Sequence, residues 1–141
     1  MQKNGSDSKM NRKQERKEAL YLIFELNFHK DETANDLFEN AAELRDLVIT
    51  DYIRKTVTGV EENIAKIDIL IEKYLKNWKL TRLSAITLSI LRLAVFEMLY
   101  NEDIPENIAI NEAIELAKEF DADDMPAFIN GVLGNISRNK E

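Results

Sequence analysis

The chain has 141 residues, of which 45% are hydrophobic and 32% are charged, a balance typical of one globular domain and not of a disordered segment. It has no cysteine, which excludes disulfides and thiolate metal sites, and no apolar run of about 18 residues, which excludes a membrane-spanning helix. The N-terminus lacks the apolar stretch of a secretory signal, so we expect a cytoplasmic protein, and the net charge of −7 argues against general nucleic-acid affinity.

Residues 1–9 are polar and precede a second methionine, Met10. We interpret them as a disordered remnant of cloning and expect residues 10–141 to form a single domain. The charge is unevenly distributed: residues 1–19 hold six basic and three acidic side chains, a balance of +3, while the other 13 basic and 23 acidic side chains give −10. A basic arm on an acidic body indicates an anionic partner at one end of the chain.

The hydrophobic pattern of the N-terminal half predicts helices, because apolar residues recur every three or four positions. We expect one helix from about Arg12 to Phe28, with Phe28 facing inward, and another from about Thr33 to Arg45, with Leu44 on its apolar face. A long amphipathic helix follows, which we interpret as intramolecular core in preference to a coiled-coil dimer. Its apolar stripe comprises Ile53, Val57, Val60, Ile64, Ile67, Ile71 and Tyr74.

The C-terminal half predicts three more helices. The segment from about Leu83 to Tyr100 is apolar on nearly every side, so it should be central, and a charge within it such as Arg92 should find a partner or reach the surface. A helix from about Asn107 to Phe120 follows, and a last helix begins near Asp124 and buries Phe128. We therefore predict an all-α fold, a compact bundle of about six or seven helices.

Side chains suited to catalysis or metal binding are poorly grouped. His29 has no nucleophilic or acidic partner at a recognisable spacing, and we expect it at the surface or at a helix end. Asp121, Asp123 and Asp124 resemble a magnesium cluster, but we favour capping of the following helix, with a protein-partner contact as a third interpretation. With no glycine-rich phosphate loop and no paired carboxylates around a pocket, the sequence predicts no enzyme, metal or cofactor.

Two groups of side chains are the best candidates for function. The first, the basic arm, lines one flank of the first predicted helix and comprises Arg12, Lys13, Arg16, Lys17 and Tyr21. The second, the aromatic–basic group, follows the long helix and comprises Tyr74, Trp78, Lys79 and Arg82. Clustered cations suit phosphates, and aromatic rings beside cations suit single-stranded RNA. Composition alone still favours an incidental basic terminus, because a few basic residues at a chain end are common.

Several linked sequence motifs favour RNA binding more strongly than composition does. ILRLAVFEML, IPENIAINEAIELAKEF and FINGVL resemble, in order and spacing, the NusB family of transcription antitermination factors. RKQERKEALYLIFEL is similar to the basic opening of that family, and KYLKNWKLTRL is similar to its middle segment. The resemblance runs from about Arg12 to Ile136, and it implies an all-helical fold of two packed subdomains.

The resemblance also implies a function. Members of the family bind boxA-type single-stranded RNA together with NusE, a small-subunit ribosomal protein, in an antitermination complex on RNA polymerase, notably in ribosomal RNA operons. Some members form homodimers, which leaves a homodimer possible here. By position, Asp124 would face NusE. The resemblance places Arg12, Lys13 and Arg16 on phosphates and Tyr21 and Tyr74 in contact with RNA, with Lys79 and Arg82 nearby. The clustering of basic residues adds Lys17 to these predicted RNA-binding residues.

This sequence departs from the family in two places. Its arm mixes lysine and glutamate where the family is richer in arginine, which implies weaker RNA binding or more reliance on NusE. The turn expected before ILRLA carries Thr87 and Leu88 in place of an acidic and often a basic residue, so its polar contacts stay open. The alternatives are a domain related to the N-terminal domain of RNA cytosine methyltransferases, disfavoured because no methyl-donor domain follows Glu141, and a helical protein-interaction adaptor.

Overall fold

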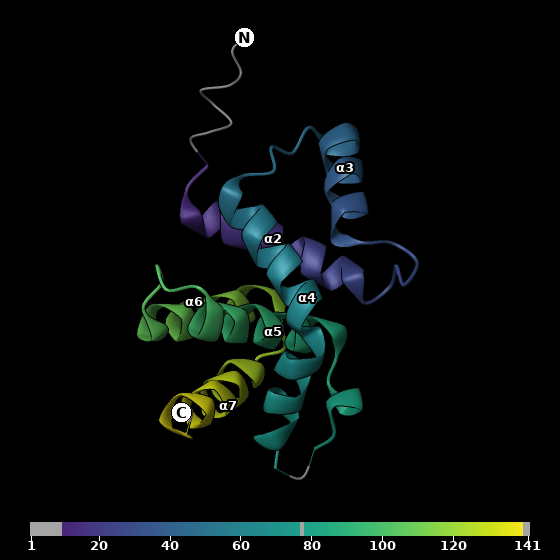
Figure 1. Cartoon of the computed structure of the whole chain (residues 1–141). Helices are drawn as coiled ribbons and strands as arrows, with labels where there is room; N and C mark the ends of the chain where they lie inside the picture. Colours follow the sequence, from purple (N-terminus) through teal and green to yellow (C-terminus); the bar gives the residue numbers. More distant parts are fainter. Residues whose placement is uncertain (1–9, 77, 140–141) are drawn as a thin grey trace. The chain divides into compact units, whose positions relative to one another are not determined.

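The computed structural model describes residues 10–76 and 78–139, so the interpretation of residues 1–9 lies outside the described residues (Figure 1). Six α-helices and one short 3-10 helix form the regular structure of this part, which contains no β-strand, and the predicted all-α fold is confirmed. The chain divides into two compact units, with the boundary between Glu61 and Glu62. None of the described helices combines the length and apolarity needed to cross a bilayer.

The first unit starts its helices with side-chain caps. Asn11 Oδ1 accepts a hydrogen bond from the Gln14 amide, and Thr33 Oγ1 accepts one from the Asp36 amide, each as part of a capping box. These caps satisfy N–H groups that have no partner within a helix, which explains why the helices begin there. The helices of this unit are α2 (Arg12–Leu26), α3 (Ala34–Arg45) and the first part of α4 (Asp51–Lys73).

Polar contacts join the three helical segments of the first unit, in which α2 packs against α3. Arg45 Nη1 donates to Glu18 Oε1 over 2.8 Å, which joins the end of α3 to α2. The Ala34 amide donates to Glu61 Oε2 over 2.8 Å, which ties the start of α3 to α4. Exposed ion pairs such as Arg45–Glu18 contribute little to stability, so apolar packing is the main source of stability for this unit.

Two apolar side chains of the first unit do not lie where the periodicity predicts. Phe28 was expected to face inward but is 61% exposed, because α2 ends at Leu26 and the chain leaves the helical path before Phe28. Its ring instead contacts Phe24, with 5.1 Å between centroids. Leu44 was expected on the buried face of α3 but is 81% exposed, so this face is covered only over the first turns of the helix. Both predictions were wrong because a periodic pattern shows neither where a helix ends nor how far along the helix its apolar face is buried.

The long helix α4 carries the predicted apolar stripe. Five of its seven members are buried, while Ile64 and Tyr74 are half-buried. The backbone angles of Asn63, φ −112° and ψ 16°, depart from helical values and produce a kink. Ile64 follows this kink directly, so the stripe is interrupted at the point where the second unit begins.

The second unit is built around α5 and α6. Along α5 every residue from Ser89 to Glu97 is buried, which confirms that this helix is central. Both α5 and α7 pack against α6, and the three helices are the green and yellow ribbons of Figure 1. The elements of this unit are the rest of α4, the 3-10 helix η1 (Leu80–Arg82), α5 (Ala85–Tyr100), α6 (Glu106–Phe120) and α7 (Met125–Asn139).

The charge of Arg92 on α5 is paired, as predicted. Arg92 donates from Nε to Asp68 Oδ1 over 2.8 Å and from Nη2 to Asp68 Oδ2 over 2.7 Å. This two-point geometry is the strong form of the arginine–carboxylate contact. Because both side chains are largely removed from water, the pair fixes α5 against the C-terminal part of α4 within the second unit.

Candidate nucleic-acid interface

The basic arm occupies the first turns of α2 and belongs to the first unit. Arg12 and Lys13 are exposed, Lys17 is half-buried, and Tyr21 is exposed further along the helix. Arg16 differs from the other cations, because only 4% of its surface is exposed. Positive charge at a helix N-terminus opposes the helix dipole, so this placement does not serve the stability of α2.

Two arginines of the arm lie over one aromatic ring. The Cζ atoms of Arg12 and Arg16 are 4.5 Å and 5.7 Å from the ring centroid of Tyr52, in the first turn of α4. Both distances fall within the range of about 6 Å in which a cation is attracted to a ring face. Arg12 Nε also donates to Glu15 Oε1 over 3.0 Å, while half of the Arg12 side chain stays exposed. Arg12 is therefore held at two points and still accessible.

The aromatic–basic group lies in the second unit, at the end of α4 and in the segment that follows. Tyr74 is half-buried, and the Nζ atom of Lys73 lies 5.6 Å from the centroid of its ring. The segment is shaped by Glu72, whose Oε2 accepts a hydrogen bond from the Leu80 amide at the start of η1. The remaining members of the group are exposed to solvent, and they are Trp78, Lys79 and Arg82.

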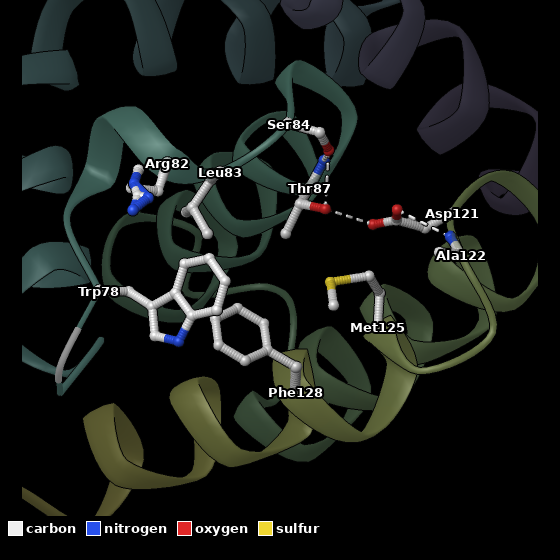
Figure 2. Close-up of a pocket in the computed structure, with 9 residues that line it drawn as sticks. All are labelled: Trp78, Arg82, Leu83, Ser84, Thr87, Asp121, Ala122, Met125 and Phe128. Carbon is white, nitrogen blue, oxygen red and sulfur yellow. Dashed lines mark hydrogen bonds between the residues drawn. The ribbon is translucent and has the colours of Figure 1, made fainter.

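A pocket of about 290 Å³ lies beside this group, between the segment around η1, the start of α5 and the start of α7 (Figure 2). Trp78 and Phe128 form one wall, in an edge-to-face contact with 6.4 Å between ring centroids. Met125 also lines the pocket, while Arg82 adds a cation to a lining that is otherwise largely apolar. The pocket therefore combines flat apolar surface with the cation of Arg82 and the carboxylate of Asp121.

The opposite wall of the pocket is polar and is held by a chain of hydrogen bonds. Ser84 Oγ donates to Thr87 Oγ1 over 3.0 Å, and Thr87 Oγ1 donates to Asp121 Oδ2 over 2.6 Å. The other carboxylate oxygen, Asp121 Oδ1, accepts from the Ala122 amide. This chain connects the first turn of α5 to the end of α6 and fixes the pocket wall (Figure 2).

The NusB family model matches residues 13–138, a span that includes parts of both units. The chain belongs to the NusB family. A curated relative, the transcription antitermination protein NusB of Clostridium novyi, is 47% identical over 131 residues, which cover 90% of this chain and 98% of the relative. Family membership thus rests on nearly the full length of both sequences.

Solved structures of NusB proteins share the fold. The NusB of T. maritima aligns with a TM-score of 0.81 and 35% identity, covering 92% of each chain. A structure of the antitermination factors NusB and NusE in complex with dsRNA aligns with a TM-score of 0.78 and 25% identity, covering 90% of this chain and 96% of that one. The six-helix arrangement is therefore that of the NusB family.

Several pocket residues of this NusB-family chain were not predicted as site residues. Phe128 was expected to be buried in the core, but it is half-buried and forms part of the pocket. Thr87 and Leu88, whose polar contacts the sequence left open, lie in the first turn of α5, where Thr87 is buried and bonded to Asp121. Contacts between α5, α6 and α7 create this wall, and no local sequence pattern encodes them.

The acidic residues before α7 separate into two kinds. Asp121 is tied to Thr87, whereas Asp123 and Asp124 are exposed. Within residues 10–76 and 78–139, no group of three histidine, cysteine or acidic side chains is arranged to hold a metal ion, so the magnesium interpretation finds no support there. His29 is exposed just beyond α2, with Nδ1 3.5 Å from Glu32 Oε1, and it lies at the surface as expected.

Proposed function

We propose that this chain is a non-enzymatic, cytoplasmic antitermination factor. It binds boxA-type RNA together with NusE and promotes read-through by RNA polymerase, notably in ribosomal RNA operons. Membership of the NusB family carries the proposal, and the clustered cations at the start of α2 support it. Because the chain has a net charge of −7, most of its surface repels RNA, and binding has to be local.

The two candidate groups have different roles in this proposal. The exposed cations of the basic arm, Arg12 and Lys13, contact RNA phosphates, with Lys17 and Tyr21 further along the same helix. In the second unit, the pocket bounded by Trp78 receives an unpaired base, because stacking on aromatic side chains is the usual means of holding one. The other members of the aromatic–basic group contact the RNA beside the pocket, and they are Tyr74, Lys79 and Arg82.

Asp124 is the residue that we propose faces NusE. It is exposed at the start of α7, and no described metal site or ion pair engages it. A charge reversal, Asp124→Lys, should weaken NusE binding measured in the absence of RNA. The neighbouring Asp123→Lys is the matched control, since it makes the same change of net charge one residue away. Equal effects of the two substitutions would contradict a specific role for Asp124.

The function is tested by titrating a boxA-type single-stranded RNA, a scrambled RNA and a duplex of the boxA sequence. Each titration is run with and without NusE and over a series of salt concentrations. We expect the boxA strand to bind most tightly, NusE to strengthen that binding, and affinity to fall steeply with salt. Equal and weak binding of all three RNAs, unaffected by NusE, would overturn the proposal.

A further inference from the structure

We infer that Tyr52 is a positioning residue for RNA binding, which acts through Arg12 and Arg16. Its ring holds both guanidinium groups in place before RNA arrives, and it does not itself touch the RNA. This inference rests on the proposed RNA-binding function of the basic arm. It concerns only the first unit, because α2 and the start of α4 both belong to that unit.

The burial of Tyr52 separates this role from base stacking. Only 6% of Tyr52 is exposed, so its ring is covered and is not available to an RNA base. The ring is nonetheless in contact with the arm, with Arg12 Cζ 4.5 Å and Arg16 Cζ 5.7 Å from its centroid. The aromatic quadrupole attracts both cations. Tyr52 therefore contacts the basic arm through Arg12 and Arg16.

The fixed position of Arg12 has a direct consequence for affinity. A free arginine side chain samples many rotamers and loses this freedom when it binds a phosphate. Here the ring of Tyr52 and the carboxylate of Glu15 already restrict Arg12, while half of its side chain is exposed. Preorganisation of this kind raises affinity because the entropic cost is met on folding and not on binding.

The position of Arg16 supports the same interpretation. Arg16 is buried and shares the Tyr52 ring with Arg12, and the helix dipole opposes positive charge at the start of a helix. A cation at this position fits a role for the arm beyond the fold, in which Arg16 raises the local positive potential next to Arg12.

The test compares Tyr52→Leu, which removes the ring, with Tyr52→Phe, which keeps it. Affinity for boxA-type RNA is measured in the presence of NusE at fixed salt. Tyr52→Leu should bind on the order of three- to tenfold more weakly, because the cation–π contacts are lost. Tyr52→Phe should bind within about twofold of the unchanged protein. Similar losses in both variants, or no loss in a folded Tyr52→Leu protein, would overturn the inference.

A double-mutant cycle separates positioning from general stability. In an Arg12→Gln background, Tyr52→Leu should cost clearly less RNA affinity, because one of the two arginines through which it acts is already gone. An undiminished loss in that background would mean that Tyr52 acts through the fold and not through Arg12, and it would contradict the inference.

Two further measurements keep the inference falsifiable. If Tyr52→Leu does not fold, Arg12→Lys replaces it: lysine keeps the charge but cannot stack as a plane, so RNA binding should weaken, and unchanged binding would overturn the inference. RNA binding by the unchanged protein distinguishes failure of the proposed function from failure of the positioning role of Tyr52. Its failure to bind boxA-type RNA would overturn the proposed function itself, whereas normal binding that is insensitive to Tyr52 would overturn only the positioning role.

Discussion

The edge-to-face contact between Trp78 and Phe128 joins the segment after α4 to the first turn of α7. Each ring supplies the surface that keeps the other in place, and together they bound the pocket of the second unit. A half-buried phenylalanine at a pocket wall can serve packing, ligand contact or both. Substitution of Phe128 can separate its contribution to packing from its contribution to ligand binding.

We predict that Phe128→Leu reduces affinity for boxA-type RNA by roughly fivefold or more, because the loss of one base–aromatic stack is worth about 1–3 kcal/mol. The loss in unfolding free energy should be small, because leucine still fills much of the apolar volume. Fluorescence anisotropy with labelled RNA measures the first quantity, and urea denaturation measures the second.

Tyr100→Leu is the matched control for Phe128→Leu. Tyr100 is an exposed aromatic residue of the same unit that stacks on Phe96, with 5.6 Å between centroids. It lies at the C-terminal end of α5, roughly 20 Å along the helix from the pocket at the N-terminal end. RNA affinity should therefore stay unchanged in this variant. A larger loss in Tyr100→Leu than in Phe128→Leu would contradict a role for the pocket.

The candidate site could be predicted from the sequence only in part. Arg12 and Lys13 are conspicuous because their charges cluster within an acidic chain. Tyr52 and Phe128 could not be identified as site residues, since their importance depends on contacts made across the fold. Tyr52 in particular lies outside every motif that resembles the family, and only the packing of α4 against the arm places its ring under Arg12.

At the scale of the elements, the ion pair between Arg92 and Asp68 is a largely buried interaction whose loss should lower stability. Asp68→Ala removes a carboxylate that the largely buried guanidinium of Arg92 contacts at two points. We predict a loss of about 3 kcal/mol in unfolding free energy. Chemical denaturation followed by circular dichroism measures this loss.

Two comparisons accompany the Asp68 prediction. Glu115→Ala removes the carboxylate of an exposed pair on α6, 3.4 Å from Lys118 Nζ, and should change stability by less than about 1 kcal/mol. Adding Arg92→Met to Asp68→Ala should recover part of the lost stability, because the largely buried guanidinium is then removed together with the Asp68 carboxylate. A single Asp68→Ala variant as stable as Glu115→Ala would show that the pair contributes little.

Helix positions could be predicted more reliably than helix ends. The starts of α2 and α3 follow from the caps at Asn11 and Thr33, which are visible in the sequence as residue types. The end of a helix depends on the residues that pack against its last turn. Leu44 shows that an apolar face can extend beyond the part of the helix that is buried. The kink at Asn63 could not be predicted either, because asparagine inside a periodic stripe has no distinctive pattern.

At the scale of the whole molecule, charge determines how RNA binding responds to salt. We propose that five cations lie at or near RNA phosphates, not counting the buried Arg16. Both units contribute to these five. If each neutralises one phosphate of a single strand, the logarithm of the binding constant falls with the logarithm of salt concentration at a slope of about −3.5. These cations are Arg12, Lys13, Lys17, Lys79 and Arg82.

We predict that the double variant Lys79→Gln with Arg82→Gln flattens this salt slope by about 1.4, since two phosphate contacts are removed. Binding titrations at four or more salt concentrations give the slope for each protein. Lys118→Gln removes an exposed cation of the same unit, on α6, and should leave the slope unchanged. An unaltered slope in the double variant would mean that RNA does not meet this part of the surface.

The chain contains a single tryptophan, and that residue is Trp78, which is 52% exposed at the edge of the pocket. The indole is thus a built-in fluorophore whose emission reports on this one location without any label. Occupation of the pocket would shield the indole from water, and the emission maximum should then move to shorter wavelength. RNA held by the basic arm alone would leave the spectrum as it is, so one emission scan separates the two modes of binding.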